Sequence, residues 1–283
     1  MPFLRMVKIE PDMANEVEQK ASSRFFDRVG RSAVGILEEV GRYGVMLSDS
    51  IYWLVMGPNL KQPVRVASVF SEMMEIGIRA IPIVGMMAGT IGIMLAIQGI
   101  YTLKIFGAES RVVIGIAFSM VREFGPLITG ILVAGRSGSA LAARLGTMKI
   151  SQEIDALEVM GINPVRFLVV PALLGCLIMV PALTFFGDVV GLWAAGVYVG
   201  VALDISMAAY IDQTIDILSV DDLMHGLGKS VIFAVLIALI GVLNGFMVRG
   251  GAEGVGKATT RAVVHCISAL VVTDMLFAFM VTR

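Results

Sequence analysis

Five charged side chains lie in or beside stretches that are otherwise apolar, and these residues are the best placed for chemistry. Arg122 and Glu123 fall near the middle of one such stretch, and Asp274 falls inside another. Lys229 and Arg261 fall at stretch edges, where a long cation can simply anchor a helix end. Because an ionisable group in a bilayer is costly unless it pairs or meets water, these residues either bind the charged part of a ligand, form a gate, or pair for structural reasons. Asp274 needs a partner, for which Arg122 or Arg261 could serve.

The composition shows what must position these charges. Of 283 residues, 57% are hydrophobic and 16% charged, and the mean hydropathy is +0.86. A soluble domain is about 45–50% apolar and about 25% charged. Uncharged runs cover 80–103, 167–187 and 230–248, and about 20 apolar residues cross a bilayer as a helix. The chain is therefore expected to be an all-α integral membrane protein, which excludes a soluble enzyme and a disordered or fibrous protein.

The expected spans alternate with loops of opposite charge character. They lie at about Ile81–Leu103, Val112–Gly135, from Phe167 onward, Ser230–Val248 and Ala262–Thr282. The connections 136–166 and 249–261 carry Lys and Arg, whereas 204–228 carries none, so the first two are expected inside and the third outside. This pattern predicts five spans. Six remain open if 167–203, whose single charge is Asp188, forms two spans joined by a loop.

The part before the spans is expected to hold an amphipathic helix. Residues 1–23 read as a polar extension with no assigned role, 24–79 as an interfacial or elbow region, and 80–283 as the transmembrane domain. Apolar residues near the 3.6-residue period, interspersed with Arg, predict a helix from Asn15 to about Met56. We expect it to lie in the cytoplasmic membrane surface; the alternative is a soluble helix packed on the rest.

The connection 136–164 contains a short expected helix, about Gln152–Met160, on the cytoplasmic side. Ser151 is its expected N-cap, and Gly161 and Pro164 are expected to stop it. Its acidic and apolar side chains suit docking into a groove of another protein, although packing on its own bundle is equally open. The candidate docking residues are Ser151, Glu153, Ile154, Asp155, Leu157 and Glu158.

Several familiar sites are not expected. The run 251–258 approaches a phosphate-binding loop, but Ala258 stands where Ser or Thr must hold magnesium. His225 and His265 are far apart, and both cysteines lie in apolar segments, so neither a metal site nor a disulfide framework is predicted. The net charge of -1 gives no reason to expect nucleic acid. We therefore expect no cofactor in this chain and no ATP hydrolysis by it.

Several long motifs, in order, resemble the MlaE/YrbE family, the permease subunits of MCE-associated ABC lipid transporters. The resemblance covers about 68–283. The most specific motif is Leu-Ala-Ala-Arg-Leu-Gly-Thr-Met-Lys-Ile-Ser-Gln-Glu-Ile-Asp-Ala-Leu-Glu-Val-Met-Gly-Ile-Asn-Pro at 141–164. Others are Val-Arg-Glu-Phe-Gly-Pro at 121–126, Ala-Gly-Arg-Ser-Gly-Ser-Ala at 134–140, Gly-Lys-Ser-Val-Ile-Phe at 228–233, Asn-Gly at 244–245 and Ala-Thr-Thr-Arg-Ala-Val-Val-His at 258–265.

The resemblance implies partners and a substrate class. It implies a dimer of permeases in a bacterial inner membrane, with a coupling helix at about 151–160 on a cytoplasmic ABC ATPase that holds ATP and magnesium. A periplasmic MCE-domain protein, and in some systems a STAS-domain subunit, complete the assembly. The cargo is phospholipid or a related lipid, and such transport supports outer-membrane lipid asymmetry or lipid trafficking.

The lipid-pocket candidates that follow from these readings are Arg122, Glu123, Lys229, Arg261, Met94, Leu95 and Ile97. For each of the three apolar residues, ordinary helix packing or lipid contact is the more common explanation. The rival function is a self-sufficient secondary transporter or channel that uses Glu123 and Asp274 as ion sites. A third is a membrane scaffold that only holds partners.

Overall fold

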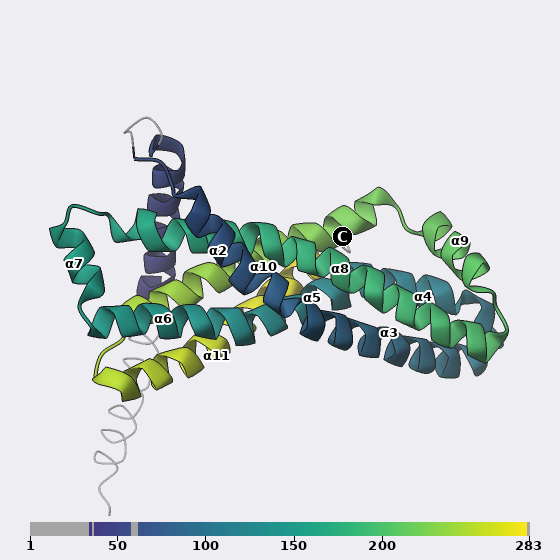
Figure 1. Ribbon diagram of the computed structural model, residues 1–283. Coiled ribbons are helices and arrows are strands. Elements are labelled where there is room, and N and C mark those ends of the chain that lie inside the picture. The colour runs from purple at the N-terminus through teal and green to yellow at the C-terminus, as the bar shows by residue number, and fades with distance from the viewer. Residues whose placement is uncertain (1–33, 36, 58–61, 282–283) are drawn as a thin grey trace, which may run out of the picture. The chain divides into compact units, whose positions relative to one another are not determined.

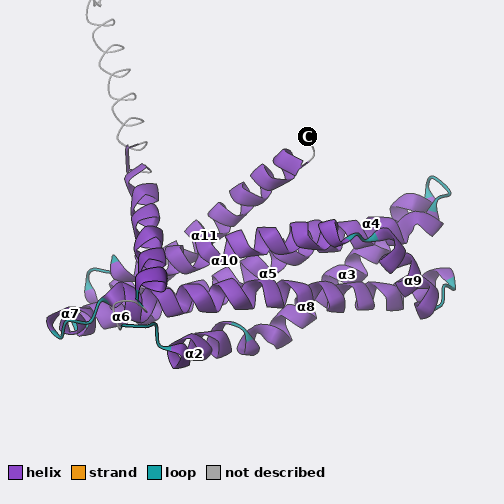
Figure 2. Ribbon diagram, turned by 90° about the horizontal axis from the view of Figure 1, so that it is seen from above, coloured by secondary structure: helices purple, strands orange, loops and turns teal. Residues whose placement is uncertain are grey.

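The computed structural model describes residues 34–35, 37–57 and 62–281, and these contain helices and loops but no strand (Figure 1; Figure 2). The chain divides into two compact units, 1–48 and 49–283. Residues 37–56 are helical, and the helix ends before Gly57. The expected start of this helix at Asn15 lies outside the described residues. Whether the helix rests in the membrane surface stays a prediction, as do the domain boundaries at 23 and 79.

Among the described residues, five continuous helical segments are long and apolar enough to cross a membrane. This confirms the prediction of five spans and makes the six-span alternative wrong. The five segments are Val66–Lys104, Glu109–Ile150, Val165–Leu203, Val220–Phe246 and Gly251–Met280. The first contains α2 (Val66–Ile76), η1 (Ile78–Ala80) and α3 (Ile81–Lys104). The second contains η2 (Glu109–Arg111), α4 (Val112–Ser119), η3 (Met120–Phe124), α5 (Gly125–Val133), η4 (Ala134–Gly138) and α6 (Ser139–Ile150). The others are η5 (Val165–Val169) with α8 (Val170–Leu203), then α10 (Val220–Phe246) and α11 (Gly251–Val281).

The third span is one unbroken helix, contrary to the possibility that Asp188 marks a loop. Asp188 lies inside the 34-residue α8 and is buried. Small residues let this helix run close to α3: a Cβ on Gly92 would come within 2.0 Å of the Gly191 carbonyl oxygen. Glycine pairs on membrane helices permit such close approach, and α3 and α8 lie side by side (Figure 2).

The prediction that 136–164 is a connection between spans is wrong over its first half. The second span continues as a helix to Ile150, because a face with Ala142, Leu145 and Gly146 is buried against other helices. A Cβ on Gly245 of α10 would meet the Leu145 Cβ at 2.7 Å. The connection proper is therefore short, and α6 belongs to the bundle core.

The last two spans begin about ten residues earlier than their apolar runs indicate. α10 begins at Val220 rather than near Ser230, and α11 begins at Gly251 rather than near Ala262. Polar first turns can be helical when their N–H groups are capped. Ser219 supplies this at α10, where it forms a capping box with Asp222.

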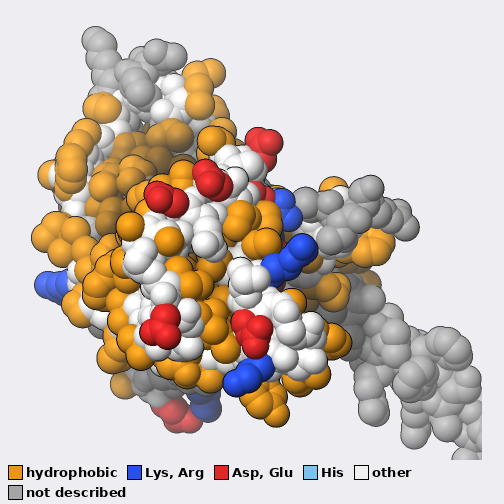
Figure 3. All heavy atoms as spheres, turned by 90° about the vertical axis from the view of Figure 1, so that its right-hand side faces the viewer, with side chains coloured by type: hydrophobic (Ala, Val, Ile, Leu, Met, Phe, Trp, Pro, Cys, Tyr) orange, Lys and Arg blue, Asp and Glu red, His pale blue; other side chains and the backbone are white. Residues whose placement is uncertain are grey.

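Two short helices mark opposite ends of the spans (Figure 1). α7 (Glu153–Val159) joins α6 to the third span, and α9 (Met207–Ile217) joins α8 to α10. Figure 3 faces the end with α9, where acidic side chains lie on a largely apolar surface. The exposed acids there include Asp204, Asp212, Asp216 and Asp221.

Candidate functional site

A break in the second span positions Arg122 and Glu123. Residues Met120–Phe124 form a π-helical segment between α4 and α5, and Pro126 follows in the first turn of α5. Proline lacks an N–H and cannot bond to the preceding turn, which explains the local widening of the helix. A π-helical segment changes the direction in which side chains leave the helix, and such segments are frequent at functional sites. The sequence placed both charges inside a span, and the structure has them there, about half-exposed at the side chain.

Lys229 is the centre of a three-helix ion cluster. Its side chain is fully buried, its Nζ donates to Glu123 Oε2 at 2.6 Å, and it lies 3.1 Å from Asp274 Oδ1. The expectation that Lys229 lies at a span edge is wrong, because α10 begins nine residues before it. The partner of Asp274 is therefore Lys229, and neither Arg122 nor Arg261. With two carboxylates on one ammonium, the cluster carries a net negative charge when all three groups are ionised.

Arg122 pairs with a different acid, Asp222, at the start of α10. The Arg122 Nε donates to Asp222 Oδ1 at 2.6 Å, and a second guanidinium nitrogen also contacts this oxygen. The other carboxylate oxygen accepts from the Ser219 backbone N–H and hydroxyl at 2.9 and 2.7 Å. Arg122 also stacks on the Phe118 ring, with its guanidinium carbon 5.1 Å from the centroid. Asp222 thus bonds both to Ser219 in the capping box of α10 and to Arg122 in the π-helical segment of the second span.

Two glycines let neighbouring helices meet this break. A Cβ on Gly226 of α10 would come within 2.1 Å of the Val121 carbonyl oxygen, and one on Gly125 would overlap Asp188 Oδ1 of α8 at 1.7 Å. That Asp188 oxygen is buried and has no hydrogen-bond partner among the described residues. Sequence reasoning did not select Asp188 or Asp222, although a lone acid in a long apolar run is a usable signal.

The remaining lipid-pocket candidates do not join the cluster. Arg261 donates through Nε to Asn244 Oδ1 at 2.7 Å, and Asn244 lies 15 residues beyond Lys229 on α10, or about 22 Å at 1.5 Å per residue. Arg261 also lies ten residues inside α11 rather than at a span edge. On α3, Met94 and Ile97 are exposed, while Leu95 packs partly buried against a core cluster.

α7 presents a mostly exposed surface at the end of the bundle. Ile154 is its one buried residue and Leu157 is half-buried, so these two hold the helix to the bundle. Glu153, Asp155 and Glu158 face outward. Asp155 also accepts from Lys149 Nζ of α6 at 2.7 Å, which fixes the helix to the end of the second span. The docking candidates therefore separate into an inner apolar pair and an outer acidic set.

The start of α7 differs from the prediction, whereas its end at Gly161 agrees with it. Its N-cap is Gln152, with φ 59° and no side-chain cap, so the prediction of Ser151 as N-cap is wrong. The Ser151 hydroxyl instead donates to the Thr147 carbonyl at 2.7 Å. At the C-terminus, Gly161 has φ 74°. Its N–H donates to Glu158, and the Ile162 N–H donates to Leu157, which is the Schellman pattern.

The near-match to a phosphate-binding loop is part of a helix. Residues 251–258 form the first turns of α11, whereas a phosphate-binding loop needs an irregular glycine-rich turn between a strand and a helix. Among the residues that the structure describes, no group of three His, Cys, Asp or Glu side chains could hold a metal ion.

Within the described part of the chain, five helices long and apolar enough to cross a membrane, with charges buried between them, define a multi-pass membrane protein. The family described as Permease MlaE matches residues 69–280. The chain belongs to this family and is an ABC transporter permease, the non-catalytic transmembrane component of such a transporter.

Curated relatives match most of the chain. A probable ABC transporter permease protein of Rickettsia typhi is 31% identical over 88% of this chain and 96% of its own length. The intermembrane phospholipid transport system permease protein MlaE of Haemophilus influenzae is 32% identical over 89% of this chain and 95% of its own. The chloroplastic protein trigalactosyldiacylglycerol 1 of Arabidopsis thaliana is 30% identical over 77% of this chain and 63% of its own.

Proposed function

We propose that this permease moves phospholipid, or a related lipid, between a bacterial inner membrane and a periplasmic MCE-domain protein. ATP hydrolysis on a separate cytoplasmic ATPase drives the movement. The Haemophilus influenzae relative is named an intermembrane phospholipid transport system permease, and this name supports phospholipid as the cargo. The assembly includes a second copy of the chain and, in some systems, a STAS-domain subunit. Such transport supports outer-membrane lipid asymmetry or lipid trafficking.

The observation that carries the ATP-driven part is the outward acidic face of α7. Asp155 and Glu158 are exposed on a short helix that is itself fixed to α6 by an ion pair and to the bundle by Ile154. A push on a helix held in this way is transmitted to the second span, which also carries Arg122 and Glu123. This geometry supports α7 as the coupling helix of the ATPase.

The lipid part rests on the side chains around the π-helical break. Arg122 and Glu123 each keep about two fifths of their side-chain surface exposed although their partners are buried. An accessible guanidinium can bind a phosphate through its planar fork of N–H groups. In this proposal Arg122 contacts the phosphate of the lipid, and the Lys229 cluster fixes the depth at which the headgroup stops. Exposed Met94 and Ile97 supply apolar surface for acyl chains.

Charge reversal on α7 tests the coupling. Asp155→Lys and Glu158→Lys together should abolish retention of the ATPase by the tagged permease in mild detergent, and should abolish ATP-dependent transfer of labelled phospholipid. The matched control is Asp212→Lys on α9, at the opposite end, which should retain the ATPase. A double variant that keeps both the ATPase and full transfer would refute the proposed coupling helix.

The alternative of a secondary transporter with Glu123 and Asp274 as ion sites has less support, because Lys229 already neutralises part of the charge of both acids. The two mechanisms separate in liposomes. The purified chain alone should move no lipid or ion, and transfer should require the ATPase and ATP. Transfer by the lone chain without ATP would favour the alternative.

A further inference from the structure

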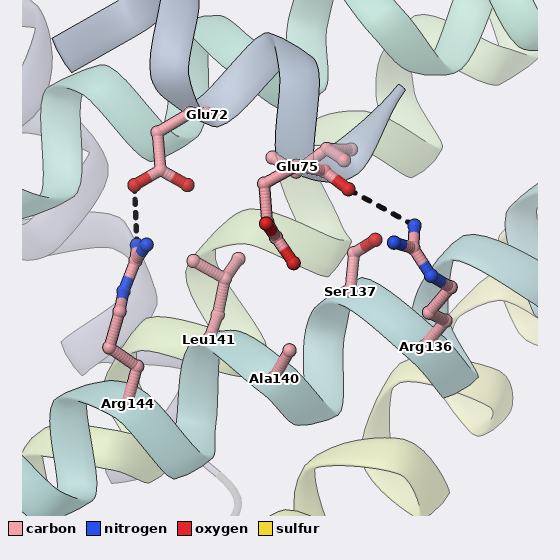
Figure 4. A pocket seen from close by; sticks show the side chains of 8 residues that line it. Glu72, Glu75, Arg136, Ser137, Ala140, Leu141 and Arg144 are labelled. Carbon is pink, nitrogen blue, oxygen red and sulfur yellow. Dashed lines mark hydrogen bonds and ion pairs between the residues drawn. The ribbon is translucent and has the colours of Figure 1, made fainter. Parts of the chain in front are cut away.

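A cavity with charged side chains in its lining lies apart from the Lys229 cluster, between α2 and η4–α6 (Figure 4). It has a volume of about 300 Å³, and side chains from the two helices point toward one another across it. Its lining consists of Glu72, Glu75, Ile76, Arg136, Ser137, Ala140, Leu141 and Arg144. Gly175 of α8 makes room for Glu72 behind it, since a Cβ there would meet the Glu72 Cβ at 2.8 Å.

Two buried polar atoms of this lining lack a partner among the described residues: Glu72 Oε2 and Ser137 Oγ. Both residues are at least nine-tenths buried. The other Glu72 oxygen accepts from Arg144 at 2.5 Å. Buried polar groups in folded proteins are nearly always satisfied by protein, water or ligand. In the lining of the cavity, one carboxylate oxygen of Glu72 can therefore still accept a hydrogen bond, and the Ser137 hydroxyl can still donate one.

Arg136 supplies the opposite charge. Its Nη1 donates to the Glu75 backbone carbonyl at 3.1 Å, and the part of the chain that the structure describes offers its guanidinium no carboxylate in ion-pair distance. The Glu75 carboxylate instead forms an ion pair with Arg79, with 2.5 Å between Glu75 Oε2 and Arg79 Nη1. Arg136 lies toward one end of the lining of η4–α6, and Glu72 pairs with Arg144 toward the other (Figure 4). A ligand with a cationic and an anionic group would complete both ends.

The position of α2 indicates that the ligand is a lipid. α3 alone has 24 residues, about 36 Å of helix, and so covers the hydrocarbon core of about 30 Å. α2 precedes it and falls at headgroup level. One face of α2 carries exposed Val66, Phe70 and Met74, while Glu72 and Ile76 on the other face are buried. The apolar face of α2 is thus turned away from the cavity and is available to contact acyl chains of the surrounding lipid, while its other face lines the cavity.

We propose that this cavity binds the zwitterionic headgroup of an amine-bearing phospholipid, of the phosphatidylethanolamine class, from the membrane leaflet on the α7 side. The ammonium donates to Glu72 Oε2, the phosphate accepts from Arg136, and the Ser137 hydroxyl donates to a phosphate oxygen. This second lipid site does not rest on the proposed transport function, because it requires only that the protein spans a membrane.

Binding of short-chain lipids to the full-length protein in detergent, measured by native mass spectrometry, tests this assignment. The probes are dioctanoyl phosphatidylethanolamine, dioctanoyl phosphatidylglycerol, which lacks the ammonium, and water-soluble glycerophosphoethanolamine, which lacks the acyl chains. Glu72→Gln should weaken binding of the ethanolamine lipid about tenfold, the size of a lost charge-assisted hydrogen bond, but should not weaken binding of the anionic glycerol lipid, because it frees Arg144 of the lining from its acid. Arg136→Gln should weaken both, and the control Lys104→Gln, an exposed cation at the far end of α3 and outside the lining, neither.

Two further measurements keep the test decisive. Ala140→Leu should fill the cavity without removing a charge, and should weaken the ethanolamine lipid even if the charge variants fold poorly. Every effect should persist in an Arg122→Gln background, which separates this site from the proposed transport site. The assignment is overturned if wild-type protein binds the glycerol lipid as tightly as the ethanolamine lipid, if glycerophosphoethanolamine binds equally well, or if Ala140→Leu and Glu72→Gln leave binding unchanged.

Discussion

Lys229 is the residue on which the ion cluster depends, because one buried ammonium serves two carboxylates from other helices. Replacing it with Met would leave Glu123 and Asp274 without their cation. Removing one partner of a buried ion pair typically costs about 3–5 kcal/mol. We therefore expect Lys229→Met to lower the thermal unfolding midpoint strongly, as followed by circular dichroism in detergent.

The control for this change is Lys257→Met on α11. Lys257 also forms an ion pair, with Glu253 at 2.7 Å, but both side chains are exposed, and such surface pairs contribute about 0–1 kcal/mol. Adding Glu123→Gln and Asp274→Asn to Lys229→Met should restore part of the lost stability, since no unpaired charge then remains. If Lys229→Met melts like the wild type, the cluster is not a structural ion pair.

The residues of the cluster were only partly predictable from sequence. Arg122, Glu123 and Asp274 interrupt apolar runs, and that signal is reliable because a bilayer penalises charge. The central role of Lys229 was hidden, because the uncharged run begins one residue after it and so places it at a span edge. The role of Asp222 could not be predicted for the same reason. Asp222 looks like a loop residue in the sequence, and only the structure shows that it lies in the first turn of α10, which Ser219 caps.

At the level of helices, the break in the second span depends on close contact with α10. Gly226→Ala would put a Cβ within 2.1 Å of the Val121 carbonyl oxygen, so the two helices must separate. Overpacking of this kind typically costs about 1–3 kcal/mol. We expect a lower unfolding midpoint and weaker lipid transfer, because the position of Arg122 against Asp222 depends on the same contact.

Gly228→Ala, two residues along α10, is the matched control. No neighbouring atom lies within 4 Å of a Cβ there, and alanine favours a helix over glycine by about 1 kcal/mol. This variant should be neutral or slightly more stable than the wild type. Equal losses in both variants would mean that the helix backbone, rather than the contact with Val121, is responsible.

The short helix α7 depends on a glycine at its end. Gly161 has φ 74°, and a residue with a Cβ pays about 1–2 kcal/mol in this conformation. Gly161→Ala should therefore speed hydrogen exchange of the amides in 153–160, measured by mass spectrometry, with little change in the global midpoint. Gly256→Ala, inside α11 with no atom near its Cβ, should leave that exchange unchanged. Unaltered exchange in Gly161→Ala would contradict the role of the Schellman ending.

The existence and the stop of α7 could be predicted, because Gly161 and Pro164 are strong local signals. The cap could not, since Ser151 also satisfies its hydroxyl by donating to the turn before it. The extension of α6 to Ile150 was missed for a different reason. Its Ala and Gly residues look like a polar connection in isolation, and only their burial against α10 and α11 makes them a core face.

For the whole molecule, the number of spans fixes which ends share a side of the membrane. Charge in the loops favoured five spans, while the length of 167–203 favoured six. The structure has one continuous 34-residue helix in this region, so the chain has five spans. Gly187 and Gly191 let the helix around Asp188 pack closely against α3, and it therefore does not turn there. Periodicity within one helix carries no such information about its neighbours.

Cysteine labelling can check this arrangement in the native membrane. Cys176 and Cys266 are both fully buried, so a membrane-impermeant maleimide should give little background. Cysteines at Glu158, Glu253 and Asp212, all exposed in the structure, report on α7, the start of α11 and α9. With five spans, Glu158→Cys and Glu253→Cys should react from one side only and Asp212→Cys from the other, because an odd number of spans separates α9 from both. A six-span chain would put positions 158 and 253 on opposite sides, so labelling of these two from different sides would contradict the fold.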